Sequence, residues 1–513
     1  MRHVTARVLA RRVIVCATAI ILAVSANAAP MPKDHTCLLI VMDGLRPDYI
    51  TPDLMPRLYA FSEESFVCDD HHSVFPTVTR LNATSFSTGA YPATHGILGN
   101  SIYVPEANPT AGISTGSADR MKKADEATGG KLITAVTLGE LLQQRGQKLL
   151  IASSGSPGSA FLLNHKISGG AILNCELTLP ASLEPRILQL QGPVPPETMP
   201  NKALNARAVD AYLKFGLDEF HPAVTILWIS DPDHTAHESG IGSPLTNDAL
   251  RAVDTEFGRI LDTLKQKGLT TKVNVFVASD HGFATQNGPA DIPALLIENK
   301  LKASKDSGDV IVAEGAIYVK NHDPEIIAKI VKLLQATPWA GAIFTKEAAP
   351  GSPQGVIPGT LSQSAIHWNH PRAGDILVSA NWTDDANEFA YKGRTTLPGP
   401  AGHGTSSPYE IHNVLIAAGP EIKAKTHNPA PTGNIDLAPT LCFLNQIATP
   451  LTMNGRILHE LLKDGPDPKS VPVKRQTTET QATNNGVRYH LTMTTARVAN
   501  TDYLDSTKVD RTP

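Results

Sequence analysis

Two continuous apolar runs, each followed by an aspartate and a histidine, constrain this chain more than any other feature. The runs lie at residues 224–230 and 273–279, and they predict strands buried on both faces of a sheet. The polar residues that follow them are Asp233, His237, Asp280 and His281. Carboxylates and imidazoles at strand ends are common metal ligands, so two such pairs predict two metal ions side by side. This arrangement favours metal-assisted chemistry on an oxyanion ester such as a phosphate.

Predicted strands and helices alternate along most of the chain. Residues 38–42 and 149–152 are further apolar runs that predict strands. A capping box begins the predicted helix at 137–146, and apolar residues at helical spacing follow at 250–264. This alternation predicts an α/β protein with a mostly parallel central sheet that helices cover on both faces.

One stretch interrupts the alternation and sets the predicted domain limits. Residues 292–396 combine short strands with a helix at 324–334, which predicts an inserted α+β cap. The polar stretch at 464–485 predicts a linker before a late hairpin. The predicted parts are a signal peptide at 1–28, core segments at 29–291 and 397–463, the cap at 292–396, and the linker and C-terminal β-hairpin at 464–513.

The N-terminal segment predicts export. Several arginines precede a short apolar run at residues 13–24, and Ala26-Asn27-Ala28 has the form of a cleavage site. A cleaved signal peptide predicts a periplasmic or secreted protein that keeps no membrane span. An uncleaved anchor is the alternative.

Composition argues against two other classes of site. A net charge of −4 and an aromatic content of 5% oppose binding to a nucleic-acid polymer. The cysteines after the predicted signal peptide have no Cys-x-x-Cys spacing, which opposes a thiolate zinc site. These cysteines form either two disulfides, in one of three pairings, or buried thiols. They are Cys37, Cys68, Cys175 and Cys442.

Three further positions have suitable chemistry but are ambiguous when each is considered alone. Asp43 follows the predicted strand at 38–42 and either holds a cation or binds backbone N–H groups in a turn. Thr79 precedes a short predicted helix at 80–88, where a hydroxyl is either a cap or a nucleophile. His403 lies in a glycine-rich loop and either reaches a metal or lies at the surface.

Short motifs occur in a fixed order between residues 37 and 444. They are VMDG at 41–44, FPTVT at 75–79 with Asn82 and Gly89, HGI at 95–97 with Asn100, residues 231–237, SDHG at 279–282, and GHG at 402–404. As a set they resemble the alkaline phosphatase superfamily, in its type I phosphodiesterase/nucleotide pyrophosphatase branch. The resemblance implies a three-layer α/β sandwich with a mostly parallel central sheet.

The resemblance also implies two zinc ions with separate ligand sets. The first set is Asp233, His237 and His403, and the second is Asp43, Asp280, His281 and Thr79. Oxygen and imidazole ligands suit zinc, although manganese and cobalt also fit such a set.

The catalytic roles are likewise implied by the resemblance. Thr79 would be the nucleophile and would form a covalent phosphoryl-threonine, which is then hydrolysed. Asn100 would donate a hydrogen bond to a non-bridging phosphoryl oxygen. Arg80 departs from the Phe-Pro that many members carry after the nucleophile, and it either binds a second charged group of the substrate or is a solvated helix residue.

Together these features predict an exported two-zinc enzyme that hydrolyses small phosphate diesters, with nucleotides among the candidate substrates. A phosphomonoesterase or a phosphonate hydrolase of the same superfamily is the alternative. A non-catalytic metal-binding protein is a remote alternative.

Overall fold

The computed structural model describes residues 35–167, 169–484 and 486–513, and a nine-stranded sheet lies at its centre. The strand order is β22-β2-β21-β10-β1-β9-β6-β7-β8. Five adjacent strands are parallel: β10 (Val273–Ala278), β1 (Thr36–Met42), β9 (Val224–Ile229), β6 (Leu149–Ser153) and β7 (Ala171–Asn174). Antiparallel pairings occur toward the edges, at β21 (Leu415–Ala418), β2 (Phe66–Cys68) and β8 (Leu177–Leu179), and β22 (Thr426–Asn428) pairs parallel with β2. The predicted mostly parallel sheet is therefore confirmed.

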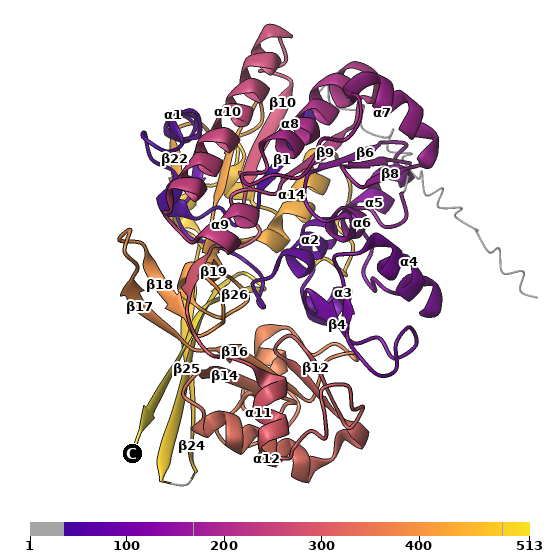
Figure 1. Ribbon diagram of the computed structural model, residues 1–513. Helices are drawn as coiled ribbons and strands as arrows, with labels where there is room; N and C mark the ends of the chain where they lie inside the picture. The colour runs from indigo at the N-terminus through magenta and orange to yellow at the C-terminus, as the bar shows by residue number, and fades with distance from the viewer. Residues whose placement is uncertain (1–34, 168, 485) are drawn as a thin grey trace, which may run out of the picture. The chain divides into compact units, whose positions relative to one another are not determined.

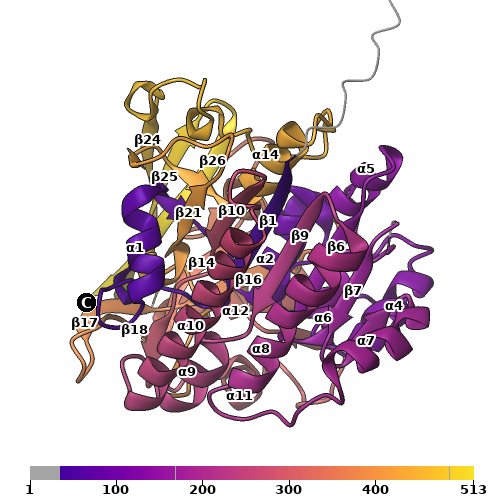
Figure 2. The same ribbon diagram turned by 90° about the horizontal axis from the view of Figure 1, so that it is seen from above.

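Helices pack on both faces of this sheet, as Figures 1 and 2 show. Successive residues of β1 point to opposite faces, and both sets are buried in apolar clusters. One face is covered by α1 (Pro56–Glu64), α8 (Lys202–Asp210) and α10 (Pro244–Gln266). The other is covered by α2 (Thr79–Thr88), α5 (Leu138–Gln144), α6 (Pro157–Leu163) and α14 (Leu437–Leu444). Burial on both faces explains why the strand sequences are continuously apolar.

A second, five-stranded sheet forms within the region predicted as a cap. Its order is β12 (Val310–Ala313), β13 (Ala316–Val319), β16 (Ile376–Ala380), β14 (Ala340–Thr345) and β15 (Leu361–Ser362). The helices of this region include α11 (Ile292–Glu298) and α12 (Pro324–Ala336). The next strands, β17 (Trp382–Ala386) and β18 (Lys392–Thr395), instead share a sheet with β11 (Ala284–Gln286) and β19 (Ala401–Gly402). The domain limits themselves stay a prediction.

The C-terminal region contains three antiparallel strands where a linker and a hairpin were predicted. They are β24 (Lys474–Asn484), β25 (Val487–Val498) and β26 (Thr501–Thr512). The linker prediction over 464–485 is wrong for β24, because this strand is polar on both faces and so lacks an apolar alternation. β25 packs against the cap sheet, where Tyr489 Oη donates to Gly341 O at 2.9 Å and Leu491 is buried (Figure 1).

The remaining shorter elements connect these layers. They are β3 (His71–His72), α3 (Pro92–His95), β4 (Ser101–Ile102), β5 (Ile113–Ser114), α4 (Ala118–Ala127), α7 (Glu184–Gln191), α9 (Asp233–Ser239), α13 (Pro408–Ile411), β20 (His412–Asn413) and β23 (Thr432–Gly433). The predicted signal peptide at 1–28 lies outside the described residues. Within the described ranges, none of the helices combines the length and apolarity needed to cross a membrane.

The sequence left open whether the cysteines form disulfides or remain thiols, and the structure favours thiols. Cys68, Cys175 and Cys442 carry thiols rather than disulfides. Burial raises the pKa of the Cys68 and Cys442 thiols to about 12, so both are inert, uncharged core residues at neutral pH.

One buried histidine makes the stability of this fold sensitive to pH. The His95 imidazole Nδ1 accepts from the Ile97 N–H at 3.1 Å, and its Nε2 lies 3.2 Å from Ser85 Oγ. Burial lowers the pKa of His95 to about 3. Below about pH 6.5 the unfolded chain binds a proton that the folded chain does not, so stability falls as the pH drops from about 6.5 toward 3.

We expect His95→Asn to weaken this pH dependence. Each such histidine costs about 1.4 kcal/mol per pH unit within that window. Melting temperatures of wild type and variant at pH 7.5 and pH 5.0 check this, and the variant should lose fewer degrees on acidification. Equal losses in both proteins would show that His95 does not contribute.

Candidate active site

The carboxyl ends of three adjacent parallel strands bring the predicted metal ligands together. Asp43 follows β1, Asp233 begins α9 just after β9, and Asp280 follows β10. The Asp43 N–H donates to Ile229 O at 3.0 Å, and the Asp233 N–H donates to Asp43 O at 3.0 Å. These backbone hydrogen bonds hold the loops in register, so side chains far apart in sequence meet at one edge of the sheet.

The first ligand set surrounds Asp233. Its Oδ1 atom lies 3.3 Å from His237 Nε2 and 3.2 Å from His403 Nε2. Residues four apart on one helical turn face the same way, which explains the first contact. His403 comes from the loop after β19, and its ring stacks on that of His281 with centroids 3.5 Å apart. The three predicted residues therefore lie together.

The second set surrounds His281. Its Nε2 atom lies 3.1 Å from Asp280 Oδ2 and 3.6 Å from Asp43 Oδ1. Thr79 Oγ1 is 3.2 Å from the same nitrogen. The two sets adjoin, since His281 Nε2 lies 4.0 Å from Asp233 Oδ1.

Hydrogen bonds from behind the site fix the tautomer of each histidine. The Nδ1 atoms of His237, His281 and His403 lie 3.1, 2.9 and 2.7 Å from the backbone oxygens of Ala401, Gly282 and Thr77. A carbonyl only accepts, so Nδ1 carries the proton and Nε2 directs its lone pair at the carboxylates. Metal-binding histidines have this arrangement.

The carboxylates are held in the same asymmetric way. Asp43 Oδ2 accepts from Trp228 Nε1 at 2.9 Å, and Asp280 Oδ1 accepts from the Gly44 N–H at 3.1 Å. Their other oxygens, like Asp233 Oδ1, are buried and accept no hydrogen bond from the described residues. Orphaned buried oxygens opposite imidazole lone pairs are costly unless cations lie between them, so the residues fit metal ions.

The charge balance leads to the same conclusion. Burial, followed by the negative charges of Asp280 and Asp233, raises the pKa of Asp43 well above its usual range. Asp43 is stable as an anion beside these two carboxylates only if cations offset the repulsion.

Thr79 is the first residue of α2, and Asn100 lies beside it. The Arg80 N–H donates to Asn100 Oδ1 at 2.9 Å. This bond occupies the amide oxygen and leaves the Asn100 NH₂ group to donate. The Asn100 N–H in turn donates to the cap residue Glu314, whose Oε2 is 2.8 Å away. Glu314 was missed by the sequence analysis, because no motif marks it.

A cavity of about 780 Å³ opens onto Thr79. Asp43, Thr79 and Arg80 line it, together with the apolar side chains of Val194 and Met199. Arg80 has a buried Nε without a hydrogen-bond partner among the described residues. The cavity can therefore take a substituent on phosphorus that is larger than the phosphoryl group.

Comparison with known proteins places this site in a family. The chain is 22% identical over 457 residues to ectonucleotide pyrophosphatase/phosphodiesterase family member 7 of Mus musculus, covering 88% of this chain and 93% of that protein. It is 24% identical over 430 residues to the Mus musculus bis(5'-adenosyl)-triphosphatase enpp4, covering 82% and 80%.

The fold has solved counterparts. Murine ectonucleotide pyrophosphatase/phosphodiesterase 5, in an inactive variant bound to AMP, matches with a TM-score of 0.58 at 19% identity, over 84% of this chain and all of that one. The sequence model of the type I phosphodiesterase / nucleotide pyrophosphatase family matches residues 37–387. The chain therefore belongs to this family and is a phosphoric ester hydrolase with an alkaline-phosphatase-like fold.

Proposed function

We propose that this enzyme hydrolyses small phosphate diesters with two zinc ions and a covalent phosphoryl-threonine. The observation that carries the proposal is the position of Thr79, whose Oγ1 lies 3.2 Å from a nitrogen of the second ligand set. The Thr79 hydroxyl therefore contacts His281 Nε2, which is the atom that the buried carboxylates of Asp43 and Asp280 also face. A hydroxyl with only a capping role would instead accept from its own helix, and α2 has no side-chain cap.

Asp233, His237 and His403 would hold one zinc ion, and Asp43, Asp280, His281 and Thr79 the other. When bound, the ions supply Lewis acidity, which lowers the pKa of a ligated hydroxyl and offsets charge on the phosphoryl oxygens. Their number and identity are part of the proposal.

Thr79 and Asn100 would have different roles in the reaction. The Thr79 oxygen, after loss of its proton to solvent, attacks phosphorus as the bond to the leaving-group oxygen breaks and that oxygen takes up a proton. Water then cleaves the new Thr79 O–P bond and restores the hydroxyl. The Asn100 NH₂ group donates to a non-bridging oxygen, where negative charge accumulates in the transition state.

The cavity supports the proposed substrate class. Its partly apolar wall suits the second ester substituent of a diester, and its volume of about 780 Å³ admits a nucleoside. The relative named bis(5'-adenosyl)-triphosphatase and the AMP-bound structure support nucleotides as candidates. Export to the periplasm or the medium is supported by the predicted signal peptide at residues 1–28.

The test compares kcat/KM for bis-p-nitrophenyl phosphate and p-nitrophenyl phosphate on zinc-loaded protein. The proposal expects a clear preference for the diester, and a preference for the monoester would overturn it. In that case Arg80→Ala should lower monoester turnover more than diester turnover, because a guanidinium would then bind the dianion. No turnover of either compound would leave phosphonates as the class to assay.

We expect Asn100→Ala to lower kcat by about 10²-fold with a smaller change in KM, since its hydrogen bond strengthens in the transition state. Steady-state kinetics with the diester measure this. Asn108→Ala is the control, because Asn108 is a loop asparagine whose side chain bonds only to Thr110 in the described structure. A loss carried entirely by KM would assign Asn100 to ground-state binding instead.

A further inference from the structure

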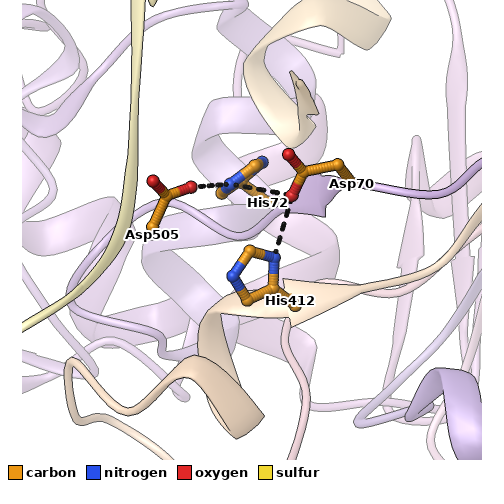
Figure 3. A group of neighbouring side chains, drawn as sticks. All are labelled: Asp70, His72, His412 and Asp505. Carbon is orange, nitrogen blue, oxygen red and sulfur yellow. Dashed lines mark hydrogen bonds and ion pairs between the residues drawn. The ribbon is translucent and has the colours of Figure 1, made fainter. Parts of the chain in front are cut away.

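A second group of histidines and aspartates lies outside the active site. Figure 3 shows its members, Asp70, His72, His412 and Asp505, with their side chains directed toward one another. Asp70 Oδ1 lies 3.3 Å from His412 Nδ1 and 3.5 Å from His72 Nε2. His72 Nε2 lies 3.0 Å from Asp505 Oδ1. One atom from each residue falls within 4.8 Å of the others.

The backbone brings these residues together from three separate parts of the chain. β3 and β20 pair antiparallel with His72 opposite His412. Asp505 lies on β26, where the register shifts: Thr494 pairs with Ser506 but Thr495 pairs with Leu504. Asp505 is therefore the extra residue of a β-bulge, and a bulge re-aims a side chain. The irregularity in β26 places this carboxylate at the cluster.

The orientation of the His72 ring directs Nε2 at the two carboxylates. Its side chain is 1% exposed, and its Nδ1 lies 2.9 Å from Thr432 O, which only accepts. Nδ1 therefore carries a proton, and Nε2 faces two carboxylate oxygens, where it binds either a second proton or a metal ion. A lone pair buried against anions is unfavourable, so a proton or a metal ion must occupy Nε2. The three active-site histidines have the same arrangement, each with Nδ1 at a backbone oxygen.

The outer oxygens of both carboxylates are already occupied. Arg475 Nη2 lies 2.7 Å from Asp70 Oδ2, and Arg475 Nη1 lies 3.3 Å from Asp505 Oδ2. The Oδ1 atoms are the ones that approach His72. Carboxylates that bind metals are commonly oriented by such outer hydrogen bonds.

Three of the six ligand-to-ligand distances in the cluster suit a tetrahedral ion, and the other atoms lie within 4.8 Å of one another. Bonds of about 2.0–2.1 Å to nitrogen and oxygen place neighbouring ligand atoms about 3.3 Å apart in a tetrahedron. The contacts in the cluster are 3.0, 3.3 and 3.5 Å, against 3.1–3.6 Å within the two catalytic ligand sets. We propose that Asp70, His72, His412 and Asp505 bind a third, structural zinc ion. Two imidazoles suit zinc, whereas calcium and magnesium prefer oxygen ligands alone.

The ion would tie the C-terminal sheet to the core. Asp505 belongs to β26, while His72 and His412 belong to a small sheet whose strands continue into the catalytic loops. Four protein ligands leave no open position, as is usual for structural zinc. Its loss should therefore lower stability and leave the chemistry at Thr79 largely intact.

The experiment measures zinc content and melting temperature in full-length protein with Asp233→Asn and Asp280→Asn, which disable the catalytic ligand sets. In this background we expect about one equivalent of zinc after desalting and a rise in melting temperature when zinc is added to the stripped protein. Adding His412→Ala or Asp505→Asn should abolish both.

His427→Ala is the matched control. His427 also pairs with an aspartate, since its Nδ1 lies 2.7 Å from Asp69 Oδ1, but its side chain is 69% exposed and belongs to none of the potential metal-ligand groups among the described residues. It should keep the zinc and the stabilisation. Equal zinc content and equal zinc response with and without His412→Ala would overturn the proposal and make the cluster an ion-pair network of His72, Asp70, Asp505 and Arg475. In the otherwise unmutated enzyme, His412→Ala should keep kcat/KM within about twofold. Loss of the structural zinc site can therefore be distinguished from a failure of the proposed diesterase activity.

Discussion

Replacing Thr79 with alanine is expected to lower kcat for bis-p-nitrophenyl phosphate by at least about 10³-fold, because the change removes the oxygen that we propose attacks phosphorus. The zinc content should stay unchanged, since the three carboxylates and three imidazoles of the two ligand sets remain. Steady-state kinetics and metal analysis on the same preparation measure both quantities. Retained metal with lost turnover also excludes the non-catalytic alternative, in which Thr79 has no function to lose.

Thr88→Ala is the matched control, because it makes the same change at the far end of the same helix. Thr88 Oγ1 donates to Thr84 O at 2.7 Å within α2 and touches neither ligand set. It should reduce stability slightly and leave kcat near the wild-type value. Thr79→Ser keeps a hydroxyl and should retain much more activity than Thr79→Ala. A Thr79→Ala enzyme within tenfold of wild type would mean that water attacks the diester directly.

Most of the candidate ligands could be predicted from the sequence because their positions follow local rules. Asp43 and Asp280 follow continuous apolar strands, and parallel strands place such positions at one edge of a sheet. His237 lies one helical turn after Asp233, so its direction is set by helix geometry. His403 had no such rule, since a glycine-rich loop has many conformations, and only the family resemblance assigned it.

The supporting residues could not be predicted, because their partners are distant in sequence. Trp228 holds Asp43 from a strand that reads as plain apolar core, and Glu314 reaches Asn100 from the cap across 214 positions. β24 was missed because two polar faces give no hydrophobic period. The cluster at His72 also depends on a bulge in β26, which pairing geometry creates and composition does not mark.

Replacing Asp280 with asparagine is expected to lower kcat/KM by at least about 10³-fold and to remove zinc from the second ligand set. The Asp280 side chain is fully buried. An asparagine oxygen can still accept from the Gly44 N–H, so the shape of the loop should survive. What is lost is the anionic oxygen 3.1 Å from His281 Nε2, and with it the negative charge that offsets a divalent ion.

Asp254→Asn separates this effect from the cost of changing any buried aspartate. Asp254 is 3% exposed and accepts from the N–H groups of Arg57 and Leu58 at 3.0 and 2.8 Å, near the N-terminus of α1 and away from the ligand sets. It should keep zinc and activity. Chelator-stripped wild type should recover turnover when zinc is added, whereas Asp280→Asn should stay inactive at the same zinc concentration. An Asp280→Asn enzyme that keeps both zinc and turnover would show that the Asp280 carboxylate does not hold the second ion. That ion would then have other ligands than the set around His281 and Thr79.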